Sequence, residues 1–131
     1  MKAYSKKKKI FLVDDNTHFQ DIVTSMLSAK YNIITSKSGE AALKFLINNK
    51  PDLILLDITM VDVDGWEIYH QIKGISLLNQ VPIAFVATLS EEEGMENATR
   101  LGAIDYFKKP IKRTDFLKRI KKILIYRTTL Q

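Results

Sequence analysis

The chain has 131 residues, of which 46% are hydrophobic and 27% are charged, and its formal net charge is +5. This length and composition suit a single globular domain with a sizeable core. The absence of cysteine excludes disulfides, thiolate metal sites and cysteine nucleophiles, and it is compatible with the cytoplasmic location that we expect. No apolar run approaches the roughly 20 residues that cross a bilayer, so we expect no membrane association.

Positive residues gather in two stretches, at 2–9 and 108–122. The simplest interpretation is a solvated surface, and nucleic acid or an acidic protein surface is the alternative partner. Because no helix-turn-helix or zinc-finger spacing accompanies these residues, we expect no direct binding to nucleic acid.

The predicted elements alternate from the N-terminus to the C-terminus. Short apolar runs predict strands at residues 9–13, 31–35, 53–56, 81–87 and 104–107. After each run, a capping residue and apolar residues at helical spacing predict helices that begin near Asn16, Ser38, Asp64, Ser90 and Thr114. The longest connection, Gly74–Gln80, is expected to be an ordinary surface loop.

Regular alternation of continuous apolar strands with helices is typical of a parallel sheet that helices cover on both faces. We therefore predict an α/β fold of the (βα)5 type. It is a doubly wound five-stranded parallel sheet with the flavodoxin-like order 2-1-3-4-5. No internal repeat or second domain is visible, so we interpret residues 1–131 as one domain.

Charged residues follow three of the predicted strands: Asp14-Asp15, Asp57 and Lys109. Strands one and three are neighbours in the predicted order, and ligands bind outside the carboxyl ends of strands in such sheets. Three carboxylates so close would raise one another's pKa, and a divalent cation resolves that conflict. A few oxygen ligands, with water completing the set, describe a Mg²⁺ site. With Lys109 nearby, the group would suit phosphoryl transfer onto Asp57.

In this order and spacing, Asp14-Asp15, Asp57 and Lys109-Pro110 resemble the receiver domain of two-component response regulators. The resemblance extends from about residue 8 to residue 124 and leaves a basic N-terminal tail at residues 1–8. It implies that Asp57 accepts a phosphoryl group from a histidine kinase or a histidine phosphotransfer protein. It also implies that Lys109 binds the phosphoryl oxygens and that the Lys109-Pro110 peptide is cis.

The resemblance further implies which residues hold the metal. Asp15, Asp57 and the backbone carbonyl of Thr59 would ligate Mg²⁺ directly. Asp14 would act mostly through a water molecule.

One departure from the family concerns a hydroxyl at the end of strand four. The family commonly has Ser or Thr there, which moves to bond the phosphoryl group while an aromatic residue on strand five, here Tyr106, turns inward. In this chain the position falls on Ala87, and Thr88 follows it. Either Thr88 reaches the site through a local shift, or the domain responds weakly or differently. Our hypothesis is that Ala87 uncouples phosphorylation from the face formed by the last two helices and the last strand.

A second departure is Val61, where the family commonly has proline. The loop after Asp57 would then be less rigid, because proline restricts the backbone.

The resulting interpretation is a signalling module whose output is a change of surface for a downstream partner, with a dimer through that same face left open. We expect phosphorylation and dephosphorylation of the chain itself, and no enzyme action on an outside substrate. A Mg²⁺-dependent phosphatase would need a second carboxylate two residues after Asp57, where Thr59 stands. Flavin binding would place a phosphate beside Asp14-Asp15, which would repel it. A pseudo-receiver that binds a partner without phosphorylation remains the alternative, because Ala87 has no hydroxyl.

Overall fold

The computed structural model describes residues 7–60 and 64–130, with side chains as far as residue 125. Val61 and most of the predicted N-terminal tail therefore lie outside the described residues. The strands are β1 (Lys9–Val13), β2 (Asn32–Ser36), β3 (Leu53–Asp57), β4 (Ile83–Ala87) and β5 (Asp105–Lys108). The helices are α1 (Thr17–Leu27), α2 (Gly39–Asn48), α3 (Gly65–Lys73), α4 (Glu91–Leu101) and α5 (Arg113–Leu130), with a short 3-10 helix η1 (Ser76–Leu78).

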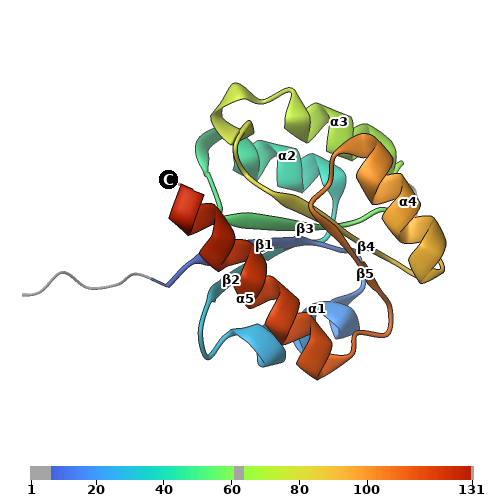
Figure 1. Cartoon of the computed structure of the whole chain (residues 1–131). Coiled ribbons are helices and arrows are strands. Elements are labelled where there is room, and N and C mark those ends of the chain that lie inside the picture. The colour runs from blue at the N-terminus through green and yellow to red at the C-terminus, as the bar shows by residue number, and fades with distance from the viewer. Residues whose placement is uncertain (1–6, 61–63, 131) are drawn as a thin grey trace, which may run out of the picture.

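All strand pairs are parallel, and the sheet has the order β2-β1-β3-β4-β5. Figure 1 shows α2, α3 and α4 on one face of this sheet and α1 and α5 on the other. The predicted doubly wound α/β fold, with its flavodoxin-like strand order, is confirmed. The order reverses direction between β1 and β3, so the carboxyl ends of these two neighbours border the switch point of the sheet.

The core has two layers because successive side chains of a strand point to opposite faces of the sheet. In β1, Phe11 and Val13 pack with residues of α2, α3 and α4. Ile10 and Leu12, by contrast, pack with residues of α1 and α5. Among the described residues, no helix has both the length and the apolar character that crossing a membrane would require.

The helix N-termini lie close to the predicted capping residues. The side chains of Asn16, Ser38, Asp64 and Ser90 each accept a hydrogen bond from a backbone N–H in the first turn of α1, α2, α3 and α4. Each cap satisfies a donor that has no partner within the helix. The last helix begins at Arg113, one residue before the predicted start.

The segment Gly74–Gln80 differs most from its prediction. A plain surface loop is wrong here, because η1 occupies the middle of the segment. The side chain of Leu78 is 1% exposed and joins the core layer beneath α2, α3 and α4. Burying one leucine contributes about 1.5–3 kcal/mol, which favours a compact turn over an open loop.

Candidate functional site

Three carboxylates meet at the carboxyl edge of the sheet. Asp14 follows β1 and Asp57 ends β3, and these strands pair directly in the register Val13↔Leu56. One carboxylate oxygen of each of Asp14, Asp15 and Asp57 lies within 4.8 Å of the others. Asp14 is 0% exposed and Asp57 is 2% exposed. Two negative charges at that separation repel by about 3 kcal/mol at an effective dielectric constant of about 20, so a nearby cation would stabilise the cluster.

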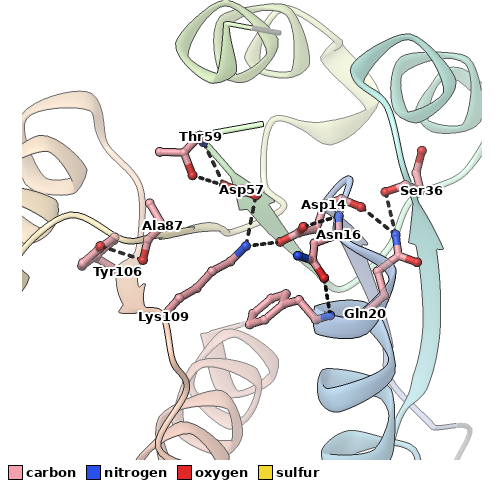
Figure 2. A network of polar contacts seen from close by, with 10 residues as sticks. Asp14, Asn16, Gln20, Ser36, Asp57, Thr59, Ala87, Tyr106 and Lys109 are labelled. Atoms are coloured by element: carbon pink, nitrogen blue, oxygen red, sulfur yellow. Dashed lines mark hydrogen bonds and ion pairs between the residues drawn. The ribbon is translucent and has the colours of Figure 1, made fainter. Parts of the chain in front are cut away.

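Lys109 supplies one positive charge to the cluster. Its Nζ lies 2.8 Å from Asp14 Oδ2 and 3.2 Å from Asp57 Oδ2. Dashed lines in Figure 2 mark both contacts. The same Nζ lies 4.2 Å from the centroid of the Phe19 ring, which is a cation–π contact from α1. Burial by itself would lower the pKa of Lys109, but the ion pairs with Asp14 and Asp57 outweigh burial and raise it. Lys109 is therefore a fixed cation that faces both buried acids.

Asp14 is a buried acid whose pKa differs from its usual value. Its pKa is raised mainly by burial and further by the charge of Asp57, although Lys109 and the backbone N–H of Asn16 oppose the shift. The repulsion expected from the sequence is present, but burial is the larger cause. Apart from its ion pair with Lys109, the buried Oδ2 of Asp14 has no hydrogen-bond donor among the described residues. A set of carboxylate oxygens with such an atom fits a hard divalent cation.

Thr59 contacts the acid of β3 in a way that the sequence did not indicate. Its backbone N–H and its side-chain hydroxyl both donate hydrogen bonds to Asp57 Oδ1, each at 2.8 Å. The prediction considered only the backbone carbonyl of Thr59. The two oxygens of Asp57 therefore have separate partners: Thr59 on Oδ1 and Lys109 on Oδ2.

Gln20 is a positioning residue that the sequence reasoning missed. Its side-chain amide donates to the backbone carbonyls of Asp14, at 2.7 Å, and of Ser36, at 3.2 Å. It thereby ties the end of β1 to the end of β2 (Figure 2). A signal was available, because Gln20 stands three residues before Val23 and seven before Leu27 on the buried stripe of α1.

This geometry, with a buried acid at the end of β3 and a lysine after β5, has a counterpart among known proteins. The family model described as the response regulator receiver domain matches residues 10–121. The chain belongs to this family.

Relatives of this receiver domain include regulators and proteins of other kinds. It is 36% identical over 118 residues to the alkaline phosphatase synthesis transcriptional regulatory protein PhoP of Bacillus subtilis, covering 89% of this chain and 48% of that protein. It is 34% identical over 102 residues to a "probable cyclic di-GMP phosphodiesterase" of Vibrio cholerae, covering 78% of this chain and 23% of that protein. The receiver domain thus spans about half or less of the length of these curated relatives.

A solved structure matches the receiver domain over nearly all of both chains. The chemotaxis protein CheY4 of Vibrio cholerae has a TM-score of 0.81 and 25% sequence identity, covering 90% of this chain and 99% of that one.

The Lys109-Pro110 peptide is cis, as the resemblance implied.

The end of β4 in this receiver domain carries no hydroxyl. Ala87 is fully buried, and its carbonyl accepts hydrogen bonds from the backbone N–H of Lys109, at 2.7 Å, and from the hydroxyl of Tyr106, at 3.0 Å. Thr88 is exposed and donates no hydrogen bond to Asp57 within the described part of the chain. The structure therefore brings Asp14, Asp15, Asp57, Thr59 and Lys109 together and leaves Thr88 outside the group.

Tyr106 already lies inside the domain. Its side chain is 2% exposed, and its hydroxyl donates to the carbonyls of Ala87 and Leu89, the second at 2.6 Å. Burial, with the nearby charges of Glu93 and Glu91, raises the pKa of Tyr106 to about 12. The phenol is therefore a neutral donor at physiological pH.

Proposed function

We propose that this receiver domain takes a phosphoryl group onto Asp57 from a phosphohistidine of a histidine kinase or a histidine phosphotransfer protein. The observation that supports the proposal most is the ion pair of Lys109 with Asp57, which sets a cation against a buried carboxylate. A carboxylate can attack phosphorus. Phosphoryl transfer depends on positioning and on cations that neutralise charge on the phosphoryl oxygens, and this site offers both.

In the proposed step, one oxygen of Asp57 forms a bond to phosphorus as the bond between phosphorus and the imidazole nitrogen breaks. The nitrogen leaves with the bonding electron pair and takes up a proton, so that the donor returns to an ordinary histidine. Lys109 Nζ turns from the carboxylate of Asp57 toward the incoming phosphoryl oxygens. Its contacts with Asp14 and the Phe19 ring keep the ammonium group at the site meanwhile.

The proposal includes a Mg²⁺ requirement. Asp15, Asp57 and the carbonyl of Thr59 would hold the ion directly, and Asp14 would hold it through a water molecule. When bound, Mg²⁺ supplies positive charge to the phosphoryl oxygens and to the clustered carboxylates. The buried Oδ2 of Asp14, which has only Lys109 as its partner among the described residues, supports this assignment.

We propose that the output is a change of surface for a downstream protein in the cytoplasm, and that no outside substrate is turned over. Direct contact with nucleic acid is not part of the proposal. A second copy of the chain could pair through α4, β5 and α5, because α4 begins with Glu91, Glu92 and Glu93 whereas α5 carries Lys118, Lys121 and Lys122. Under two-fold symmetry the acidic helix of each copy would face the basic helix of the other.

One observation favours a second candidate function. Ala87 has no hydroxyl, so a pseudo-receiver that binds its partner without phosphorylation is the alternative. Such a domain would take up no phosphoryl group and would still bind its partner.

Incubation with acetyl phosphate and Mg²⁺, followed by intact-mass spectrometry, tests the leading proposal. We expect one added phosphoryl group in the wild type, none in Asp57→Asn, and none after removal of Mg²⁺ by chelation. Asp21→Asn, an exposed acid on α1, is the matched control and should be labelled as the wild type is. An unlabelled wild type, or a labelled Asp57→Asn, would contradict the proposal.

A further inference from the structure

The hydroxyl that contacts the acceptor carboxylate belongs to the loop after β3 and not to the end of β4. Thr59 Oγ1 donates to Asp57 Oδ1 at 2.8 Å, whereas Ala87 has no hydroxyl and Thr88 is exposed (Figure 2). The backbone N–H of Thr59 donates to the same oxygen. Asp57 Oδ1 thus accepts hydrogen bonds from both the hydroxyl and the backbone N–H of Thr59.

Phosphorylation would change the acceptor that this hydroxyl prefers. A carboxylate oxygen loses its negative charge when the group becomes an acyl phosphate. A phosphoryl group carries a charge of about −1.5 to −2 at neutral pH and three strong acceptor oxygens. Hydrogen bonds to charged acceptors are about twice as strong as neutral ones. The hydroxyl of Thr59 therefore gains by moving from Asp57 to a phosphoryl oxygen, and the exposed position of Thr59 leaves it room to move.

On the other side of the site, the space behind Ala87 is already filled. The hydroxyl of Tyr106 is bonded to the carbonyls of Ala87 and Leu89. Its ring lies against Gly94 of α4 so closely that a Cβ added to this glycine would come within 2.1 Å of the ring. In this structure the Tyr106 ring already occupies the inward position, so an inward turn is not the change that we assign to phosphorylation.

The backbone next to Thr59 packs directly against α3. A Cβ added to Gly65, the first residue of α3, would lie 2.4 Å from the Cα of Ile58, so the helix rests on the backbone between Asp57 and Thr59. The next residue, Trp66, is half-buried, and its ring contacts the Phe85 ring of β4 edge-on with centroids 5.4 Å apart. Packed elements without free space transmit small displacements.

We propose that Thr59 supplies the hydroxyl that binds the phosphoryl group, and that the surface that responds is the N-terminal end of α3 instead of α4 and β5. The inference rests on the proposed phosphorylation of Asp57. It assigns a phosphoryl-binding role to the side chain of Thr59, of which only the backbone carbonyl was expected to act.

The test uses beryllofluoride with Mg²⁺ as the phosphoryl mimic on the full chain. Backbone amide shifts and the fluorescence of Trp66, the single tryptophan of the chain, are measured before and after addition. The variants are Thr59→Val, which removes the hydroxyl at nearly constant shape, Thr59→Ser, which keeps it, and Thr88→Val, which removes the rival hydroxyl. Acetyl phosphate labelling of every variant is measured separately.

In the wild type, Thr59→Ser and Thr88→Val, we expect the largest amide shifts in residues 64–68 and a clear change of Trp66 fluorescence. Thr59→Val should lose more than half of both signals even at saturating beryllofluoride, and its labelling by acetyl phosphate should be slower than that of Thr59→Ser. Largest wild-type shifts in residues 90–107, full signals in Thr59→Val, or their loss in Thr88→Val would each overturn the inference alone. A wild type that takes up no acetyl phosphate would overturn the proposed function and the inference with it.

Discussion

At the scale of single residues, the site buries negative charge. Asp14 and Asp57 are both buried, and both form an ion pair with Lys109. Removing a charge from water costs several kcal/mol even where a partner is near. Buried acids of this kind therefore suit the proposed chemistry of the site but lower the free energy of unfolding.

Replacing Asp14 with asparagine should stabilise the metal-free protein at pH 7, by about 1 kcal/mol, because it removes a buried charge and keeps the shape. The folded-state pKa of Asp14 is raised above 3.8, so its contribution to stability is complete below pH 3.8 and is lost as pH rises through the folded value. The stabilisation by Asp14→Asn should accordingly disappear in acid. Urea unfolding of both proteins at several pH values measures this difference in the free energy of unfolding.

Mg²⁺ provides the control for this variant. If Asp14 helps to hold the ion, millimolar MgCl₂ should raise the unfolding midpoint of the wild type more than that of Asp14→Asn, because a ligand stabilises the state that binds it. An equal rise in both proteins would show that Asp14 has no part in binding the ion.

At the scale of elements, two glycines let helices lie directly on their neighbours. Gly65 brings α3 onto the backbone of Ile58, and Gly94 brings α4 onto the ring of Tyr106. Neither glycine has an unusual φ angle, so space and not backbone freedom is the reason for the residue type. These contacts fix how closely both helices approach the rest of the domain.

Gly94→Ala tests the contact between α4 and β5. Alanine is the better helix former by about 1 kcal/mol, but the added methyl would meet the Tyr106 ring, and overpacking costs about 1–3 kcal/mol. We expect a net loss of about 1 kcal/mol in the free energy of unfolding, measured by urea denaturation. In a Tyr106→Ala background the same change should become stabilising by up to about 1 kcal/mol. Stabilisation in both backgrounds would mean that the ring moves aside freely.

At the scale of the whole molecule, one sheet separates two core layers, and the site lies at the edge where its central strands end. The core layers are formed by residues from Ile10 to Leu124. The first described tertiary hydrogen bonds come from Lys7, to the carbonyl of Ser28, and from Lys8, whose carbonyl accepts from Asn32. We propose that the chain folds as one domain whose stability depends little on residues 1–6.

Deletion of residues 1–6 should change the free energy of unfolding by less than about 0.5 kcal/mol, because the core formed by the described residues begins at Ile10. Deletion of residues 1–8 also removes the acceptor for Asn32, and the loss should reach about 1 kcal/mol. Thermal or urea unfolding of the two truncated chains gives the comparison. A large loss from the shorter deletion would show that the domain extends further toward the N-terminus than we propose.

The sequence by itself indicated five strands, five helices and the acids at two strand ends, and it missed the short helix η1. Apolar strands of the lengths in β1 and β3 favour a sheet that is covered on both faces, and an acid follows β1 and ends β3. Local capping by Ser38, Asp64 and Ser90 fixed the helix starts. The strands and helix starts depend on residues within one turn or one strand, so local pattern suffices for them, whereas the strand order followed from the fold class that their alternation indicates.

Only the tertiary structure decided which groups contact one another at the site. Leu78 is buried by core residues far from it in the chain, Gln20 bonds to β2, and Tyr106 is held by Gly94 and Leu89. The hydroxyl of Thr59 reaches Asp57 because the backbone turns after β3. Each contact depends on rotamers and on the packing of segments that are distant in sequence, and residue spacing carries no information about either. The sequence could therefore predict Asp57 as the acceptor, whereas the fold alone shows which hydroxyl contacts it.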